Sequence, residues 1–370
     1  MSFYYEYEKL KELPFQQYFQ EFSNLDVKRV LNKSKLSPED LLVLLSPAAE
    51  NFIEEMAQKS HELTVQHFGK TIQLFNPIYI ADHCVNHCTY CSFSVVNHFE
   101  RKKLSMAEIE VEAKALAESG LKHILVLTGE SKTHTPVHYI ADSIKVLKKY
   151  FPSVAIEINP LDTDEYKQLV DAGVDGLVVY QEVYNEEAYK SVHIKGPKRD
   201  YRYRMDTPER GCEAGIRQVN IGALLGLDDW RKEAFFTAMH AKYLQSRYID
   251  ADISLSLPRI RPHLGEYEPP SIVEDRHLVQ AITAFRLFLP RSGITLSTRE
   301  RPEFRDNLIY LGVTKMSAGA STEVGGYSQC DAGTGTPQFD ISDERSFAEV
   351  KKMIKEKGYQ PVLKDWELLV

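Results

Sequence analysis

Eight apolar, strand-like runs recur after Thr71, and most of them are followed by a stretch with helical periodicity. The runs cover residues 72–81, 123–128, 154–159, 176–180, 219–224, 253–257, 294–297 and 313–317. The clearest helical patterns cover residues 106–119, 137–150, 163–172, 207–214, 229–246, 274–289, 302–311 and 343–357. This alternation predicts an α/β fold in which a parallel sheet closes as a (β/α)8 TIM-type barrel. An open doubly wound sheet is the alternative, but it would place a glycine-rich phosphate loop after the first strand.

The first 70 residues show helical patterns and no strand-like run. Ser37 is expected to cap a helix that begins at Pro38, because serine, proline and then acidic residues favour a first helical turn. A second helix is expected over residues 48–66. We therefore expect a helical N-terminal extension at residues 1–70, the barrel at 71–340, and a C-terminal helix and tail at 341–370. A separate N-terminal helical module is the alternative.

Three of the five cysteines, Cys84, Cys88 and Cys91, lie together directly after the first strand-like run. A tight loop can turn three such thiolates toward one metal centre. A zinc site usually takes its cysteines as two separated C-x2-C pairs, and the sequence has no second pair. The spacing therefore favours a four-iron cluster with one iron that lacks a protein ligand. Cys212 is expected to be a small buried residue, and no role is assigned to Cys330.

The active site of such a barrel lies at the carboxyl ends of its strands, so polar residues there are the candidates for function. Buried polar groups are costly without partners, and their repetition at strand ends favours a ligand-filled cavity. Arg299 and Arg259 are candidates for binding a carboxylate bidentately, with a salt bridge to a barrel acid as the alternative for each. Glu157 could accept hydrogen bonds from hydroxyl or ammonium groups of a ligand, or it could pair with a lysine.

The net charge of −8, from 45 basic and 53 acidic side chains, gives no reason to expect nucleic acid or an anionic membrane as a partner. No apolar run approaches the ~20 residues that span a bilayer. The N-terminus also lacks the basic and apolar regions of a signal peptide. We therefore expect a cytoplasmic protein, in a reducing compartment that preserves cluster thiolates.

The C-x3-C-x2-C spacing, with Tyr90 before the last cysteine, resembles the signature of the radical S-adenosylmethionine (SAM) enzymes. Gly129 and Glu130 resemble the "GGE" position of that superfamily, although Thr128 replaces the first glycine. The resemblance implies a 4Fe-4S cluster whose open iron binds SAM and whose reduction cleaves SAM to a 5′-deoxyadenosyl radical. The candidates for SAM binding are Tyr90, Gly129, Glu130, Glu157, Glu182 and Lys198.

Longer motifs carry a second resemblance that covers residues 39–366. The motifs are NPIYI at 76–80, LTGE at 127–130, VYQEVY at 179–184, GPKRDY at 196–201, GALLGL at 222–227, SLPRIRP at 256–262, LSTRE at 296–300 and DW at 365–366. Together they are similar to the 2-iminoacetate synthase family, the tyrosine lyases of thiamine biosynthesis.

This resemblance implies that SAM and L-tyrosine yield 2-iminoacetate (dehydroglycine), p-cresol, 5′-deoxyadenosine and methionine, for the thiazole of thiamine. Arg299, helped by Ser317 or Ser321, would hold the tyrosine carboxylate, and Arg259 is a further candidate. Thiazole synthase and a one-electron reductant of the flavodoxin or ferredoxin type are the implied partners. Two alternatives stay open: a radical SAM enzyme that acts on tryptophan or another substrate, and a cluster-binding scaffold without turnover.

A related tyrosine lyase makes carbon monoxide and cyanide for hydrogenase maturation, and it binds a second cluster through cysteines of an added C-terminal domain. The present sequence has no such cysteine pair before its last residue, Val370. The reaction is therefore expected to stop at dehydroglycine.

Overall fold

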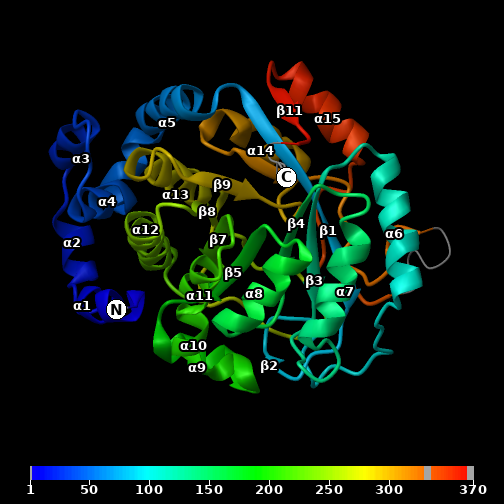
Figure 1. Ribbon diagram of the computed structural model, residues 1–370. Coiled ribbons are helices and arrows are strands. Elements are labelled where there is room, and N and C mark those ends of the chain that lie inside the picture. Colours follow the sequence, from blue (N-terminus) through cyan, green and yellow to red (C-terminus); the bar gives the residue numbers. More distant parts are fainter. Residues whose placement is uncertain (1, 329–334, 365–370) are drawn as a thin grey trace.

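The computed structural model describes residues 2–328 and 335–364, and its centre is a closed barrel of parallel strands (Figure 1). The barrel strands are β1 (Thr71–Ala81), β3 (His123–Thr128), β4 (Ser153–Glu157), β5 (Gly176–Glu182), β7 (Gln218–Ala223), β8 (Asp252–Ser256), β9 (Gly293–Leu296) and β10 (Lys315–Ser317). Each strand pairs in parallel with the next, and β10 closes the ring by pairing with β1 at Leu74↔Met316. The predicted (β/α)8 barrel is confirmed, because every predicted run overlaps one of these strands.

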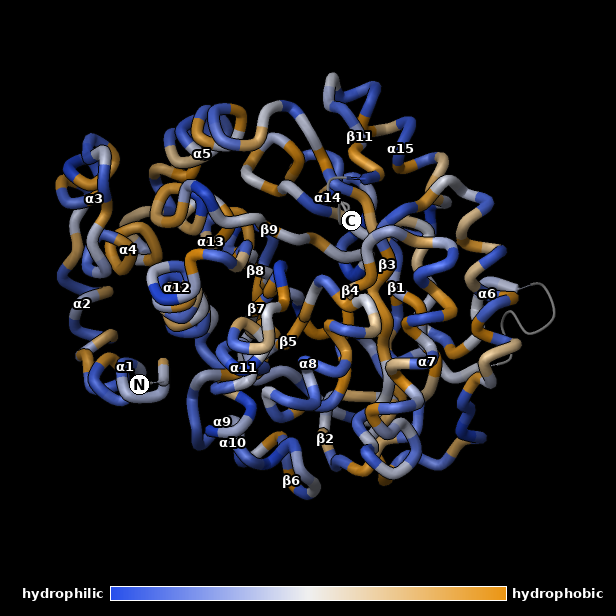
Figure 2. The backbone as a smooth tube through the Cα atoms, in the orientation of Figure 1, coloured by the Kyte–Doolittle hydropathy of each residue, from blue (hydrophilic) through white to orange (hydrophobic). Residues whose placement is uncertain are grey.

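Helices follow the strands and cover the outside of the barrel (Figure 1). They are α6 (Met106–Glu118), α7 (Val137–Leu147), α8 (Thr163–Ala172), α11 (Thr207–Glu213), α12 (Trp230–Arg247), α13 (Asp275–Phe288), α14 (Pro302–Leu308), η3 (Ile309–Leu311) and α15 (Phe347–Glu356). Figure 2 shows apolar residues along the barrel strands, and all six residues of β3 are buried. None of the helices in the described ranges is long and apolar enough to cross a membrane.

The chain before β1 is helical and packs against α12 and α13 (Figure 1). Its elements are α1 (Phe3–Leu10), α2 (Phe15–Glu21), α3 (Asn24–Leu31), α4 (Pro38–Leu45), η1 (Pro47–Phe52) and α5 (Ile53–Phe68). Ser37 caps α4 as predicted, because its side chain accepts a hydrogen bond from the Asp40 N–H at 3.2 Å. The buried amide of Gln280 on α13 donates to the carbonyls of Leu44 and Ser46, each at 2.9 Å. These bonds fix the helical segment to the barrel wall.

Several short elements were not predicted. They are β2 (His87–Cys88), α9 (Glu186–Val192), β6 (His193–Lys195), η2 (Pro197–Arg199), α10 (Tyr201–Met205) and β11 (Gln360–Val362). Strands of two or three residues are too short to leave a periodic signal. β2 pairs antiparallel with β6, which places the cysteine loop beside the chain that follows β5. β11 pairs in parallel with the beginning of β1 at Thr71↔Gln360. Cys330 and the motif at residues 365–366 lie outside the described residues.

Candidate active site

One cavity at the carboxyl ends of the strands brings together most of the predicted site residues. It has an empty volume of about 1410 Å³, which includes its open mouth. The predicted residues that line it are Cys84, Cys88, Tyr90, Cys91, Gly129, Glu130, Glu157, Glu182, Lys198, Arg299 and Ser317. Arg259 and Ser321 are not among its lining residues.

The cysteine loop after β1 is held by one arginine and by the small β2–β6 sheet. The Arg101 guanidinium donates to the carbonyls of Asp82 and Phe93, at 2.8 and 2.9 Å, and so joins the two sides of the loop. Cys88 is the partner of His193 in the β2–β6 ladder. These contacts with the protein fix the path of the loop.

The three thiols share one cavity and affect one another. Burial raises the pKa of Cys91 to about 11, with the charge of Cys84 adding to the shift. Burial also raises the pKa of Cys88 well above its usual range. Free thiols in this site are therefore protonated near neutral pH, and binding of iron must release protons. No three His, Cys, Asp or Glu side chains in residues 2–328 and 335–364 lie close enough to hold one metal ion directly. A trio of cysteines around a cavity has the donor chemistry of an iron–sulfur site.

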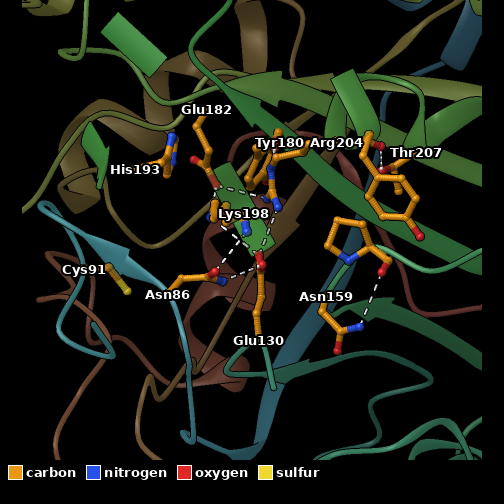
Figure 3. Close-up of polar contacts among 12 residues, drawn as sticks. Asn86, Cys91, Glu130, Asn159, Tyr180, Glu182, His193, Lys198, Arg204 and Thr207 are labelled. Atoms are coloured by element: carbon orange, nitrogen blue, oxygen red, sulfur yellow. Dashed lines mark hydrogen bonds and ion pairs between the residues drawn. The ribbon is translucent and has the colours of Figure 1, made fainter. Parts of the chain in front are cut away.

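Two carboxylates and two cations, which we call the charge cluster, lie together (Figure 3) and line the same cavity as the cysteines. Lys198 Nζ lies 2.8 Å from Glu182 and 3.6 Å from Glu130. Arg204 on α10 reaches the same two carboxylates at 3.2 and 2.9 Å. The side-chain amide of Asn86, within the cysteine loop, donates to Glu130 at 2.9 Å. The charge cluster therefore connects the cysteine loop to the ends of β3 and β5.

Both carboxylates of the charge cluster are held in their ionised form. Burial alone would raise the pKa of Glu130 and of Glu182, but Lys198 and then Arg204 outweigh it, and the pKa of each is lowered. Two anions and two cations in one buried place can exchange partners with a zwitterionic ligand without leaving an unpaired charge. The charge cluster is thus suited to a ligand with an ammonium and a carboxylate group.

Two backbone features shape the same end of the cavity. Glu182 has a φ of 71°, a left-handed conformation that costs a residue other than glycine roughly 1–3 kcal/mol and that is typical of functional sites. The β5–β7 ladder is irregular here and passes from Tyr180↔Gly222 to Glu182↔Ala223, and both Tyr180 and Glu182 line the cavity. At Gly129 a Cβ atom would lie 2.4 Å from the carbonyl oxygen of His83. Only glycine lets the cysteine loop pack this closely.

Glu157, at the end of β4, faces the same cavity. Burial, followed by the negative charge of Glu182, raises the pKa of Glu157 to about 7. Ionised Glu157 therefore lowers the stability of the folded protein without ligand, and a hydrogen-bond donor bound in the cavity would offset this destabilisation.

Replacing Glu157 with glutamine should stabilise the ligand-free protein at pH 8. Below about pH 4 the carboxyl is protonated in both the folded and the unfolded state, so the variant and the wild type should differ little. Between about pH 4.3 and 7 only the unfolded state loses the proton, so the wild type loses stability relative to the variant as the pH rises. Above pH 7 the difference should be complete, on the order of 2 kcal/mol after allowance for screening in the open cavity.

Urea unfolding at about pH 4, 6 and 8 measures the Glu157→Gln effect. Asp164→Asn, at an exposed position on α8, is the control and should show no such rise with pH. A Glu157→Gln difference that stays constant across the three pH values would contradict the assigned cost.

Arg299 and Ser317 form the polar part of the cavity at the ends of β9 and β10. The Arg299 guanidinium lies over the ring of Phe339, 3.4 Å from its centroid. The Ser317 hydroxyl accepts a hydrogen bond from the Thr298 N–H at 3.0 Å, which fixes the chain next to Arg299. A guanidinium and a hydroxyl in one cavity are suitable partners for a carboxylate.

Arg259, which was expected to bind substrate, is engaged elsewhere. It forms a bidentate ion pair with Glu300 and a further ion pair with Asp275 at 2.9 Å. The structure thus shows the salt bridge that was the alternative interpretation. Arg261, two residues later, lines the cavity in its place.

Ser321 also lies away from the cavity. Its hydroxyl accepts a hydrogen bond from the Glu323 N–H at 3.3 Å. Its neighbours Ala320 and Thr322 are the lining residues of this loop. The position of Ser321 therefore does not support the expectation that it binds substrate.

Sequence reasoning assigned no specific role to several residues of the site, among them Asn86, Arg204, Arg261 and Gln338. Asn86 had a usable signal, because it stands between two of the three cysteines. Arg204 and Gln338 had none, because each is brought to the site from a distant or short element by the tertiary fold.

Known proteins give independent information about the chain. The model of the radical SAM superfamily matches residues 78–238, and that of the biotin and thiamin synthesis associated domain matches residues 256–360. The chain is 42% identical to 2-iminoacetate synthase of Escherichia coli K12 over 343 residues, which are 92% of this chain and 90% of the relative. The corresponding enzyme of Salmonella typhimurium LT2 is 40% identical over the same shares.

Solved structures agree with these matches. The FeFe-hydrogenase maturase HydG from Carboxydothermus hydrogenoformans is 30% identical, with a TM-score of 0.85 over 98% of this chain and 83% of that one. Methylornithine synthase (PylB), at 19% identity and a TM-score of 0.74 over 91% of this chain and 97% of that one, supports the fold alone.

The closed barrel, the cysteine trio after β1 and the superfamily match define a radical SAM enzyme. Its cofactors are a 4Fe-4S cluster and SAM, for which the thiols and the charge cluster in one cavity provide suitable partners. Within this superfamily the chain belongs to the 2-iminoacetate synthase family. The resemblance seen in the sequence motifs is thereby confirmed.

Proposed function

We propose that this enzyme cleaves the Cα–Cβ bond of L-tyrosine to 2-iminoacetate and p-cresol, while SAM yields 5′-deoxyadenosine and methionine. One observation carries the proposal: the cavity that holds the cysteine trio also contains Arg299 and Ser317. The identity of 42% to a 2-iminoacetate synthase supports the choice of substrate. The product serves the thiazole of thiamine in this proposal.

In this proposal Cys84, Cys88 and Cys91 hold the cluster, and the charge cluster holds the methionyl part of SAM. When bound, the cluster and SAM together supply a carbon radical that can abstract hydrogen. Glu130 and Glu182 can accept hydrogen bonds from the SAM amino group, while Lys198 or Arg204 turns to its carboxylate. Glu157 can accept hydrogen bonds from the ribose hydroxyls, which would offset the cost of its burial. Tyr90 and Gly129 shape the same end of the cavity.

Arg299 is proposed to bind the tyrosine carboxylate bidentately, with Ser317 as a second donor. Such a clamp fixes the amino group and the Cα–Cβ bond relative to the rest of the cavity, and positioning of this kind is a large part of the protein's contribution to cofactor chemistry. Arg299 is itself held over Phe339, so its orientation is set before the substrate binds.

The chemistry also requires partners. A one-electron reductant of the flavodoxin or ferredoxin type would supply the electron for the cluster. Thiazole synthase would take up 2-iminoacetate, because an imine of this size hydrolyses readily in water and benefits from direct transfer. A cytoplasmic location fits three free thiols that must stay reduced.

Anaerobic reconstitution with iron and sulfide, followed by incubation with SAM, a reductant and one amino acid, tests the proposal. We expect 5′-deoxyadenosine and p-cresol to appear together when tyrosine is present. Tryptophan in place of tyrosine should give neither an indole-derived product nor SAM cleavage above background. SAM cleavage that does not depend on tyrosine, or that follows tryptophan, would replace this function by another radical SAM reaction.

A further inference from the structure

Residues 337–340, which we call the crossing segment, contact both the cysteine loop and Arg299. Gln338 and Phe339 of this segment line the cavity. The Ser92 N–H donates to the Gln338 carbonyl at 3.3 Å, and the Gln338 N–H donates to the Thr322 carbonyl at 3.1 Å. Phe339 carries Arg299 on its ring face. Backbone bonds on both sides of the cavity thus fix the place of Gln338.

The side chain of Gln338 is held in one orientation by two contacts. The Tyr79 O–H donates to Oε1 of Gln338 at 2.7 Å. The Nε2 atom of Gln338 lies 3.8 Å from Sγ of Cys91, in the range of an N–H···S hydrogen bond. Because the hydroxyl engages the oxygen, the amide nitrogen is the atom that faces the sulfur. Tyr79 is buried in β1 at 3% exposure, so the barrel itself sets this orientation.

An amide donor beside a cluster ligand has a defined electrostatic effect. Reduction adds an electron to the cluster, and part of the added charge resides on the sulfur ligands. An N–H group directed at a ligand sulfur stabilises the reduced state more than the oxidised state and raises the reduction potential. A purely structural glutamine would instead affect folding or cluster retention and would leave the potential unchanged.

We propose that Gln338 is a positioning residue that raises the reduction potential of the cluster held by Cys84, Cys88 and Cys91. The inference rests on the proposed function, because it requires a redox-active cluster at these cysteines. It adds a role for the crossing segment, which has no motif in the sequence and contributes the donor through the tertiary fold.

Two substitutions isolate the donor. Gln338→Met keeps the length and the neutrality of the side chain, and Gln338→Glu keeps an acceptor for Tyr79; both remove the N–H. A redox titration of the reconstituted protein, followed by electron paramagnetic resonance, measures the midpoint potential. At the wild-type midpoint potential, the ratio of reduced to oxidised cluster should fall about tenfold in Gln338→Met. This corresponds to a midpoint potential about 59 mV more negative for a one-electron couple, and Gln338→Glu should lower the potential further. Gln58→Ala, at an exposed position on α5, is the control and should titrate as the wild type does.

A Gln338→Met protein that retains its cluster and keeps this ratio within about twofold of the wild type would overturn the inference. Should both substitutions at 338 prevent cluster assembly, Tyr79→Phe serves instead. This substitution leaves Gln338 in place but removes the hydroxyl that holds its side-chain amide in one orientation. A more negative midpoint potential is therefore expected, and an unchanged midpoint potential would overturn the inference. Failure of the proposed function is distinct, because the wild type itself would then hold no redox-active cluster or release no p-cresol.

Discussion

Replacing Cys88 with alanine should give a folded protein that holds no 4Fe-4S cluster and forms no 5′-deoxyadenosine. Cys88 is 6% exposed and belongs to the β2–β6 ladder, so the backbone of the loop has support that does not depend on the thiol. Loss of one of three protein ligands leaves two irons without a protein ligand, and no cysteine outside the trio lines the cavity in the described part of the chain. Iron and sulfide content, the visible absorption of the cluster and the yield of 5′-deoxyadenosine measure the effect.

Cys212→Ala is the matched control for this experiment. Cys212 lies on α11 and is not a lining residue of the cavity. The control should retain the cluster and the full yield of 5′-deoxyadenosine. A Cys88→Ala protein that keeps both would mean that the trio is not the ligand set.

Replacing Arg299 with alanine should leave the cluster intact and raise the KM for tyrosine about 100-fold. The expected loss is about 3 kcal/mol, the usual worth of a charge-assisted hydrogen-bonded pair to a carboxylate. Because the proposed cluster ligands are the three cysteines and Arg299 is not one of them, the spectrum of the cluster should not change. Initial rates of p-cresol formation against tyrosine concentration, at saturating SAM, measure the effect.

Arg259→Ala separates the two arginine candidates. Arg259 is held by Glu300 and Asp275, so its removal should lower the free energy of unfolding and leave the KM for tyrosine near that of the wild type. If instead Arg259→Ala raised the KM and Arg299→Ala did not, the carboxylate clamp would belong to Arg259.

Barrel strands such as β3 were predictable because burial on both faces makes a strand a continuous apolar run. β3 is the clearest case, since the predicted and observed bounds agree at His123–Thr128 and all its residues are buried. The pattern did not fix the bounds or the packing of elements stabilised by distant partners. α1 lies in the region predicted to be helical, but its place is set by contacts such as that of Phe3, which stacks on His240 at 4.1 Å.

The site was predictable where a residue stands at a fixed distance from a strand end or within a compact motif. The cysteines, Glu130 and Glu157 are of this kind, and all of them line the cavity. In loops, the sequence did not indicate which of two nearby residues faces the cavity. Arg259 and Arg261 are separated by one residue; Arg259 forms ion pairs with both Glu300 and Asp275, whereas Arg261, which reaches Glu300 at 3.3 Å, lines the cavity. The position of Gln338 beside the cysteine loop is set by contacts between residues far apart in the chain, and a local sequence pattern does not indicate such contacts.

The open iron is the central claim, and magnetic resonance of the reduced cluster with isotopically labelled SAM tests it most directly. SAM labelled with nitrogen-15 at its amino group or oxygen-17 at its carboxylate should show hyperfine coupling to the cluster spin, because both groups would bind the iron that the protein leaves free. Addition of unlabelled SAM should also change the spectrum of the reduced wild-type protein. A spectrum that is unaffected by SAM, with no coupling to either label, would contradict the account.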